Sequence, residues 1–272
     1  MIQKKNDAFL YRFTYEEGWN QSFLLMSDVH FDSLYCERKI LKRHLDEALE
    51  KNARILIFGD WFDAMGAKYD PRTTPEETRS ENYINYYFDT IIDNSAKFLQ
   101  KYSDNIDLIS KGNHEESVSR RYHSDILGRL CNKINCKKGN FNGFIRLQFE
   151  HSGGGKRTSK TIYYTHGSGG NSPVTRTVIK TNRRQDAIRA DYYVAGHAHV
   201  ASEVLRSQEI LNSQCKRMVI RPLHWQLGTY FQGIGKDKWN DNKEHPPSDI
   251  GGRWVEFYYK NNEIQTKSYL AN

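Results

Sequence analysis

Short apolar runs followed by polar residues recur along the first 200 residues of the chain. Five runs have the length and the aliphatic or aromatic content of buried strands. They lie at residues 23–26, 55–58, 106–109, 162–164 and 192–194. Each run is followed within four residues by Asp, Asn or His. Because ligands bind at the carboxyl edge of the strands in layered α/β folds, the pattern predicts a site built from strand ends.

Segments between these runs carry apolar residues at helical spacing, three and four residues apart. We predict helices at residues 37–51, 76–102, 117–134 and 175–190. The 76–102 segment is rich in Tyr and Ile and lengthens the connection between two strands, so it is predicted to be an insertion near the site. As an insertion it would form either a dimer contact or a wall of the substrate cleft.

The last quarter of the chain has a different pattern. Short β segments are predicted at residues 203–205, 218–220, 225–227, 254–259 and 265–269, and a long polar loop at 233–252. A βα pattern followed by mostly β segments predicts an α/β (α+β) fold. We expect a four-layer αββα sandwich, with two mixed β-sheets packed face to face and helices outside.

Length and composition favour a single domain. A chain of 272 residues with 38% hydrophobic content can bury a substantial core. We therefore predict one domain over 1–272, with a helical insertion at about 66–103 and a β-rich part from about 200.

No stretch reaches the ~18 apolar residues of a membrane span. The N-terminal residues lack the apolar run of a signal peptide, which predicts a cytoplasmic protein with no membrane partner. Free thiols in a reducing compartment fit the four cysteines, Cys36, Cys131, Cys136 and Cys215.

Charge is unevenly spread along the chain. The net charge is +7, but residues 116–225 hold 19 Lys and Arg against 7 Asp and Glu, a net of +12. The remainder therefore carries −5. A basic half of the chain beside the predicted site at the strand ends suits a polyanionic substrate. An ordinary solvated surface would show the same charge imbalance.

Five motifs follow the predicted strands in order. They are Ser27-Asp28-Val29-His30, Gly59-Asp60-Trp61-Phe62-Asp63, Gly112-Asn113-His114-Glu115, Thr165-His166-Gly167 and Gly196-His197-Ala198-His199. Carboxylate oxygens, amide oxygens and imidazole nitrogens are ligands for divalent metals. The candidate metal ligands are Asp28, His30, Asp60, Asn113, His166, His197 and His199. Each motif alone is weak evidence for a metal site. Together they are stronger evidence, because five of the ten histidines fall within these five segments.

This ligand set predicts metal-assisted hydrolysis of a phosphate ester. Two ions ~3.5–4 Å apart can clamp a phosphate and activate a hydroxide for in-line attack, without a protein nucleophile. His114 follows a ligand directly and is predicted to protonate the leaving oxygen. Asp63 is predicted to orient a histidine by hydrogen bonding.

The five motifs resemble the calcineurin-like metallophosphoesterase family, whose pattern is Asp-x-His, Gly-Asp-x-x-Asp, Gly-Asn-His-Asp/Glu, His and Gly-His-x-His. The match covers positions 28 to 199 and fills every ligand position. The resemblance implies a double β-sandwich flanked by helices, and it puts His114 in the place of the catalytic histidine. It implies one metal held by Asp28, His30, Asp60 and His199, and a second held by Asp60, Asn113, His166 and His197. Manganese is favoured, and Fe, Zn, Ni or Mg would also fit.

The departures from the family pattern indicate which branch of the family the chain resembles. Protein Ser/Thr phosphatases continue the second motif with Arg-Gly, whereas Ala64-Met65 follows Asp63 here. They also carry an arginine before Gly-Asn-His, where this chain has Lys111. Lipid-precursor pyrophosphatases have Asn-Arg in place of Asn113-His114. The motifs resemble those of the DNA-repair exonuclease branch most closely.

Basic and aromatic residues near the motifs suggest how substrate is held. If 175–190 is helical, Arg176, Lys180, Arg183 and Arg184 share a face that could follow a phosphate backbone. The alternative is an ordinary solvated face. Trp61 flanks Asp60, as Phe62 does, and is a candidate for stacking on a base.

The sequence therefore predicts a dinuclear metal-dependent phosphodiesterase acting on nucleic acid (DNA or RNA) or on a nucleotide. Two alternatives stay open. One is a phosphomonoesterase or protein phosphatase that uses the same metals. The other is an inactive scaffold or partner-binding protein on the same fold.

Overall fold

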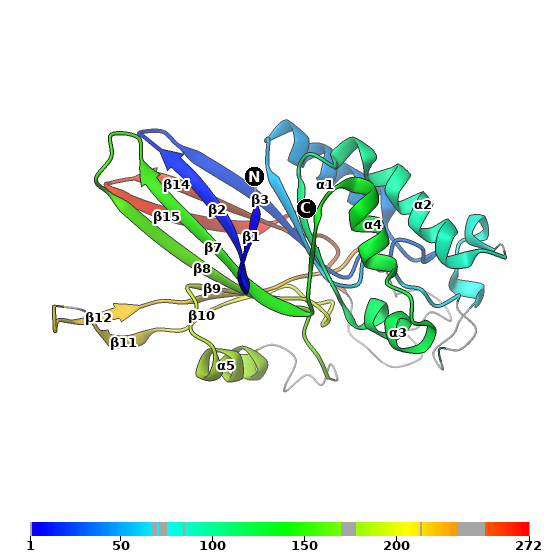
Figure 1. Cartoon of the computed structure of the whole chain (residues 1–272). Helices are drawn as coiled ribbons and strands as arrows, with labels where there is room; N and C mark the ends of the chain where they lie inside the picture. The colour runs from blue at the N-terminus through cyan, green and yellow to red at the C-terminus, as the bar shows by residue number, and fades with distance from the viewer. Residues whose placement is uncertain are drawn as a thin grey trace.

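Two mixed β-sheets form the centre of the computed structural model, which describes residues 2–66, 70, 75–83, 85–169, 178–212, 214–232 and 248–271 (Figure 1). The seven-stranded sheet has the order β1 (Gln3–Lys5), β2 (Ala8–Tyr15), β7 (Asn142–His151), β8 (Arg157–Thr165), β9 (Tyr192–Ala195), β13 (Leu223–Gln226) and β10 (Ser202–Leu205). The six-stranded sheet has the order β15 (Glu263–Leu270), β14 (Arg253–Lys260), β3 (Asn20–Met26), β4 (Arg54–Phe58), β5 (Ile106–Ser110) and β6 (Lys137–Gly139).

The inner faces of the two sheets share one apolar core. Phe23 and Phe58 from the six-stranded sheet pack in the same cluster as Leu147, Phe149 and Tyr164 from the seven-stranded sheet. All five side chains are nearly inaccessible to solvent. Because each strand turns alternate side chains to this cluster, the sheets are held face to face.

Helices cover the outer faces of both sheets. A second core joins the six-stranded sheet to α1 (Arg38–Glu50), α2 (Tyr87–Leu99) and α4 (Ile126–Ile134). On the other side, α5 (Val178–Ala187) contacts the seven-stranded sheet, where Gln185 Oε1 lies 3.2 Å from His224 Nε2 of β13. Figure 1 shows α1, α2 and α4 grouped together and α5 apart from them. The predicted four-layer αββα architecture is confirmed.

The single long helix predicted at 76–102 is wrong. The segment forms η1 (Pro75–Glu77), η2 (Ser80–Asn82), α2 and η3 (Gln100–Tyr102). Its first part makes backbone bonds to another loop instead of its own next turn: Leu34 N donates to Glu77 O at 2.8 Å, and Arg79 N donates to Asp32 O at 3.2 Å. The insertion is therefore attached directly to the loop that follows β3.

The helix predicted at 117–134 is two helices, α3 (Asn113–Tyr122) and α4. His123, with a left-handed φ of 51°, separates them. Sequence patterns also missed β1, β2, β6, β7 and β11 (Gln208–Leu211). In the described part of the chain, β11 and β12 (Arg217–Ile220) form a two-stranded sheet that projects from the body of the molecule in Figure 1.

The other predicted elements agree with the structure to within a few residues. Residues 175–177 of the predicted fourth helix and 233–247 of the predicted loop lie outside the described residues. The boundaries proposed for a single domain with an insertion stay a prediction. None of the described helices is long and apolar enough to span a membrane.

Candidate metal centre

Strand ends from both sheets meet at one place. In the six-stranded sheet, β3, β4 and β5 are parallel neighbours, so Asp28, Asp60 and Asn113 leave the same edge. In the seven-stranded sheet, β8 and β9 are parallel neighbours, and His166 and His197 follow them. The two edges face each other across the inner core. The fold therefore brings together side chains that are up to 171 positions apart in the sequence.

The seven predicted ligands form one continuous cluster. Three groups each have their ligand atoms within 4.8 Å of one another: Asp28, His30 and His199; His30, Asp60 and His114; and Asp60, His166 and His197. His30 and Asp60 each belong to two groups. The amide oxygen of Asn113 joins the cluster 3.0 Å from His166 Nε2.

Buried donor atoms in the cluster fit divalent metals. Within the described residues, the buried His30 Nε2 makes no hydrogen bond, and the buried Asp28 Oδ1 lies 3.2 Å from His199 Nε2, another candidate ligand. The other polar atom of each side chain is held in place. Asp28 Oδ2 accepts hydrogen bonds from Ser27 Oγ (2.5 Å) and His197 N (2.8 Å). His30 Nδ1 lies 2.9 Å from Asp63 Oδ1. A buried polar atom without a partner is costly, and a cation would satisfy both atoms.

Backbone carbonyls orient two more histidines. His166 Nδ1 lies 3.1 Å from Phe58 O, and His197 Nε2 lies 3.2 Å from Gly169 O. Since a carbonyl oxygen only accepts, these nitrogens donate, and the other nitrogen of each ring is left for the cluster. Such partners commonly fix metal-binding imidazoles.

Electrostatics in the cluster favour the deprotonated carboxylates that metals require. Burial would raise the pKa of Asp60, but the neighbouring His166 and His114 hold it well below its usual value. Burial would lower the pKa of His166, but Asp60 and Asp28 raise it to about 10. A proton on His166 would be displaced by a metal ion, so binding is expected to release protons.

The backbone at the ligands is held in an uncommon conformation. Asp28, His30, Asp60, His197 and His199 all have φ between 48° and 71°. Left-handed conformations of non-glycine residues are sparsely populated and cluster at functional sites. Their concentration at these five positions indicates that the surrounding structure fixes the ligand geometry.

Two glycines allow the loops to approach one another. A Cβ added at Gly112 would lie 2.1 Å from Asp60 Oδ1, and one added at Gly196 would lie 1.9 Å from Ser27 Oγ. Real Cβ atoms do not reach such distances. Glycine is therefore required at both motif positions, because the loops at the strand ends are in contact there.

His114 and Asp63, the two predicted catalytic residues, are linked to each other. His114 Nδ1 donates to the carbonyl oxygen of Asp63 at 2.6 Å, and His114 Nε2 lies 3.8 Å from Asp60 Oδ2. The Asp63 carboxylate meanwhile holds His30. The structure thus places Asp63 where it orients two histidines, one of them a predicted ligand.

Two buried carboxylates beside the site were missed by the sequence analysis. Glu115 accepts the backbone N–H groups of Asp60, Phe62 and Gly112 at 2.9–3.2 Å. Burial, together with Asp60, raises the pKa of Glu115 to about 7.

Asp32 accepts the N–H groups of Asp63 and Ala64 and the hydroxyl of Tyr87. Glu115 lies within the third motif, and Asp32 lies two residues after the first. Their positions next to the candidate ligands are the sequence signal that could have identified them.

The basic residues predicted to bind substrate differ in position. Arg176 lies outside the described residues. Arg183 is exposed on α5, while Lys180 and Arg184 are half-buried. A Cβ placed on Gly167 would lie 3.6 Å from Arg184 Nη2 and 3.4 Å from the His197 Cβ, so this guanidinium is beside the ligand loops. No carboxylate pairs with Arg184 in the described part of the chain.

The prediction that Trp61 stacks on a base is wrong. Its side chain is 0% exposed, stacks on Phe31 at 5.2 Å and donates to Ser95 Oγ at 3.0 Å. The neighbouring Phe62 is equally buried. Both rings support the Asp60 loop from inside the core, because the chain direction after β4 turns them away from the cluster.

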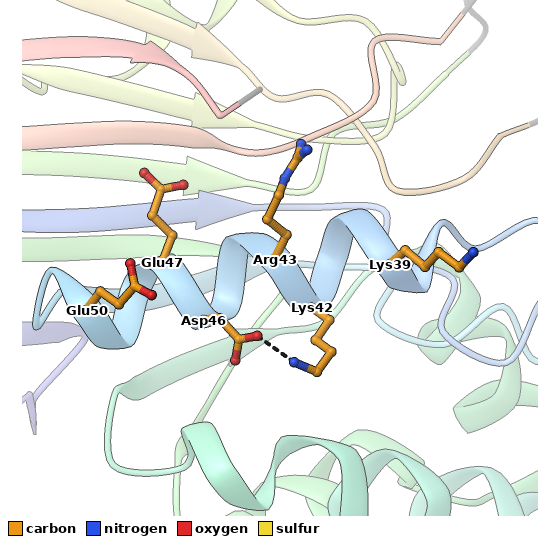
Figure 2. Close-up of a pocket in the computed structure, with 6 residues that line it drawn as sticks. All are labelled: Lys39, Lys42, Arg43, Asp46, Glu47 and Glu50. Atoms are coloured by element: carbon orange, nitrogen blue, oxygen red, sulfur yellow. Dashed lines mark hydrogen bonds and ion pairs between the residues drawn. The ribbon is translucent and has the colours of Figure 1, made fainter.

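A hollow on the outer face of α1 is separate from the metal cluster. Figure 2 shows its six lining residues on one helix: Lys39, Lys42, Arg43, Asp46, Glu47 and Glu50. None of them belongs to the ligand set. It is part of the charged surface of the helix.

A two-sheet sandwich with helices outside, and with clustered Asp and His side chains at the strand ends, is the arrangement expected of a metallophosphoesterase. The calcineurin-like phosphoesterase family model matches residues 22–201 of this chain. The protein therefore belongs to the calcineurin-like phosphoesterase family. Membership indicates a phosphoric ester hydrolase that binds divalent metal.

The chain is similar to solved structures that are distant in sequence. GAP50 of Plasmodium is 15% identical over 93% of this chain and 85% of its own, with a TM-score of 0.45. Vacuolar Protein Sorting 29 of Cryptosporidium parvum is 12% identical (92% and 97% covered, TM-score 0.40). A metallophosphoesterase of Sphaerobacter thermophilus is 13% identical (91% and 87% covered, TM-score 0.39). No curated protein sequence matches the chain.

Proposed function

We propose that the protein is a dinuclear metal-dependent phosphodiesterase acting on nucleic acid or a nucleotide. The observation that carries the proposal is the continuous ligand cluster in which Asp60 is shared between two groups of donors. A shared carboxylate can hold two ions close together. Asp28, His30 and His199 would complete one site, and Asn113, His166 and His197 the other.

Two ions in this cluster would supply Lewis-acid polarisation of a phosphoryl oxygen and a nucleophilic water at neutral pH. The chain itself supplies the proton for the leaving oxygen. His114 Nδ1 donates to Asp63 O, so Nε2 is the atom that faces the cluster and would hand over the proton. The carbonyl oxygen of Asp63 accepts from this imidazole, and Asp32 in turn accepts the backbone N–H of Asp63 at 2.7 Å, so both residues would position the ring.

Arg184 supports a substrate with more than one phosphate or with a phosphate flanked by nucleosides. It is a half-buried cation beside His197 that has no carboxylate partner among the described residues. A phosphate oxygen would satisfy its donors. Lys111, in the place where protein phosphatases carry an arginine, is instead 2.9 Å from Glu116 and so is already neutralised.

Hydrolysis of a diester and a monoester separates this proposal from its main alternative. We would compare bis-p-nitrophenyl phosphate with p-nitrophenyl phosphate, using metal-stripped protein supplied with manganese and Asp60→Asn as the control. Preference for the diester is expected. Preference for the monoester would favour a phosphomonoesterase. Turnover of neither, with metal bound, would favour the scaffold alternative.

A further inference from the structure

The strands β10 and β13 continue beyond the seven-stranded sheet as a two-stranded extension. β10 pairs with β13, and the same antiparallel register resumes between β11 and β12 up to Leu211 opposite Arg217. The pairing is interrupted at Pro222, whose backbone nitrogen has no hydrogen to donate. We call residues 206–221 the ribbon. Figure 1 shows that β11 and β12 project from the body of the molecule.

The ribbon exposes apolar side chains on both of its faces. Directly opposite residues of an antiparallel pair share a face, so Leu211 and Val219 lie on one face and Met218 on the other. The exposed fraction of the side chain is 66% for Leu211, 46% for Val219 and 42% for Met218. A two-stranded hairpin by itself is marginally stable in water, so a ribbon with this surface favours a bound partner.

The charge of the ribbon selects the kind of partner. Residues 206–221 hold four Lys and Arg against one Glu, a net charge of +3. Lys216 and Arg221, at the two ends of β12, are exposed and form no ion pair among the described residues. Two copies of the ribbon would bring like charges together, whereas a polyanion would neutralise them. The charge therefore favours nucleic acid over a second copy of the chain.

The helix α5 connects the base of the ribbon to the metal cluster. Arg206 Nη1 lies 3.1 Å from Asp186 Oδ1 of α5. Arg184 of the same helix lies beside the loop of Gly167, next to the candidate ligand His166. The helix itself holds three Lys and Arg against one Asp. Basic side chains therefore accompany the fold from the metal cluster along α5 to the ribbon.

The tip of the ribbon lies about one turn of a DNA duplex from the cluster. β9 runs parallel to β13 and leads to His197 at its carboxyl end, whereas the ribbon begins at the opposite end of these strands. In extended form, the chain from Gln226 back to Arg217 spans at most roughly 30 Å. At ~3.4 Å per base pair, this length equals about nine base pairs, close to the ~10 of one helical turn.

We propose that the ribbon docks in the major groove of a DNA duplex whose cleaved phosphate lies at the metal cluster. The major groove of B-form DNA admits a two-stranded β-ribbon, whereas the deep, narrow major groove of an RNA duplex does not. Lys216 and Arg221 would contact phosphates, and Leu211 and Val219 would contact base edges such as the thymine methyl group. The assignment rests on the proposed phosphodiesterase function and narrows its substrate to duplex DNA.

The first test is the binding of fluorescent DNA hairpins to the full chain, measured by anisotropy in chelator so that no DNA is cleaved. Stems of about 6 and about 16 base pairs are, respectively, too short and long enough to reach from the cluster to the ribbon. We expect the long stem to bind more tightly. In Lys216→Gln/Arg221→Gln, the slope of log affinity against log salt for the long stem should become shallower by about 1.8, since each lost phosphate contact removes about 0.9.

Lys4→Gln/Lys5→Gln is the matched control, because both lysines are exposed on β1, at the opposite edge of the same sheet. It should keep the wild-type salt slope. An unchanged slope in the ribbon variant, or an equal change in both variants, would overturn the assignment. An equal loss of affinity for RNA and DNA hairpins in the ribbon variant would also overturn it, because the ribbon would then not occupy a B-form groove.

Cys215, between β11 and β12, is an exposed thiol that reports contact with the ribbon directly. Saturation with the long hairpin should slow its labelling by a maleimide, followed by peptide mass spectrometry, and should leave labelling of the half-buried Cys136 unchanged. Equal labelling of Cys215 with and without DNA would contradict the assignment.

Sedimentation equilibrium tests the rival occupant, a second copy of the chain. The wild-type protein and Leu211→Glu are expected to have the same mass in solution. A wild-type dimer that Leu211→Glu converts to a monomer would show that the ribbon binds another copy, and it would overturn the DNA assignment.

Failure of the proposed function gives a different result. If the long hairpin binds through the ribbon, but neither DNA nor bis-p-nitrophenyl phosphate is hydrolysed by manganese-loaded protein, the ribbon contact stands and the phosphodiesterase is wrong. If the ester is hydrolysed but the salt slopes do not differ, the ribbon assignment is wrong and the phosphodiesterase stands.

Discussion

The candidate metal ligands follow strand ends in both sheets, whereas the candidate substrate contacts that the structure describes lie on α5 (Val178–Ala187), outside the sheets. Candidate ligands such as Asp28 and His166 are fully buried and held by hydrogen bonds. Arg183 is exposed, and Arg184 is half-buried. The two regions differ because positioning ions requires a rigid scaffold, whereas contacting a substrate requires surface.

The contrast predicts a graded response to substitution. Changes in the cluster should abolish turnover of every substrate. Changes on α5 should weaken substrate binding alone, and changes in surface charge far from both should affect only stability.

The largest effect is expected for Asp60→Asn. The variant removes the carboxylate shared by two groups of donors, so turnover of bis-p-nitrophenyl phosphate should fall by more than the ~10–100-fold that loss of an outer partner costs. Metal content measured by mass spectrometry should fall with it. Asp104→Asn, an exposed surface substitution, is the matched control. Retained activity would contradict the role of Asp60.

His114→Ala is expected to separate binding from proton transfer. With both metals bound, kcat on a diester with a poor leaving group should fall ~10²–10⁴-fold, because the proton donor is lost. A p-nitrophenyl ester needs little protonation and should be affected much less. Equal losses on both substrates would point to a structural or ligand role for His114.

Arg184→Ala should have a smaller effect, confined to substrate. Loss of a charge-assisted hydrogen bond is expected to reduce kcat/KM for a dinucleotide about tenfold or more, without loss of metal. Arg183→Ala, one position along and exposed, should change kcat/KM little. A similar loss in both variants would indicate general electrostatic attraction and not a specific contact.

The smallest effect is expected on α1, at the charged surface of Figure 2. Hydrogen bonds from Lys101 and Lys42 lower the pKa of Asp46 from 3.8. Since the folded pKa lies below the unfolded value, this stabilisation is present above about pH 4 and is lost as the pH falls through the folded pKa.

Asp46→Asn should therefore reduce the free energy of unfolding by less than ~1 kcal/mol at pH 6. At pH 2 the difference should be smaller, because the carboxyl group is then protonated in the unfolded protein and part of the stabilisation is lost. Urea unfolding at both pH values measures the difference, and an equal difference at each pH would exclude the ionic contribution.

The metal cluster could be predicted from sequence because its residues are tied to short local patterns. A buried strand of four or five residues ending in Gly-Asp or Gly-His is visible without knowing the fold, and parallel pairing then brings the ends together. The same regularity made β3, β4 and β5 predictable. The αββα layers followed from the order of these patterns.

The surrounding contacts could not be predicted, because they depend on tertiary packing. No local sequence pattern around Trp61 indicates that its ring points into the core. The 76–102 segment has helical spacing, but its first turns bond to the loop at residues 32–34 instead.

The measurement that tests the central claim most directly is a manganese titration of metal-stripped protein, with bis-p-nitrophenyl phosphate hydrolysis as the readout. If the shared cluster holds two ions that act together, turnover should stay near background through the first equivalent or rise only partly. It should reach its maximum as two equivalents per chain are bound. Full turnover at one equivalent, or in the presence of chelator, would contradict a dinuclear site.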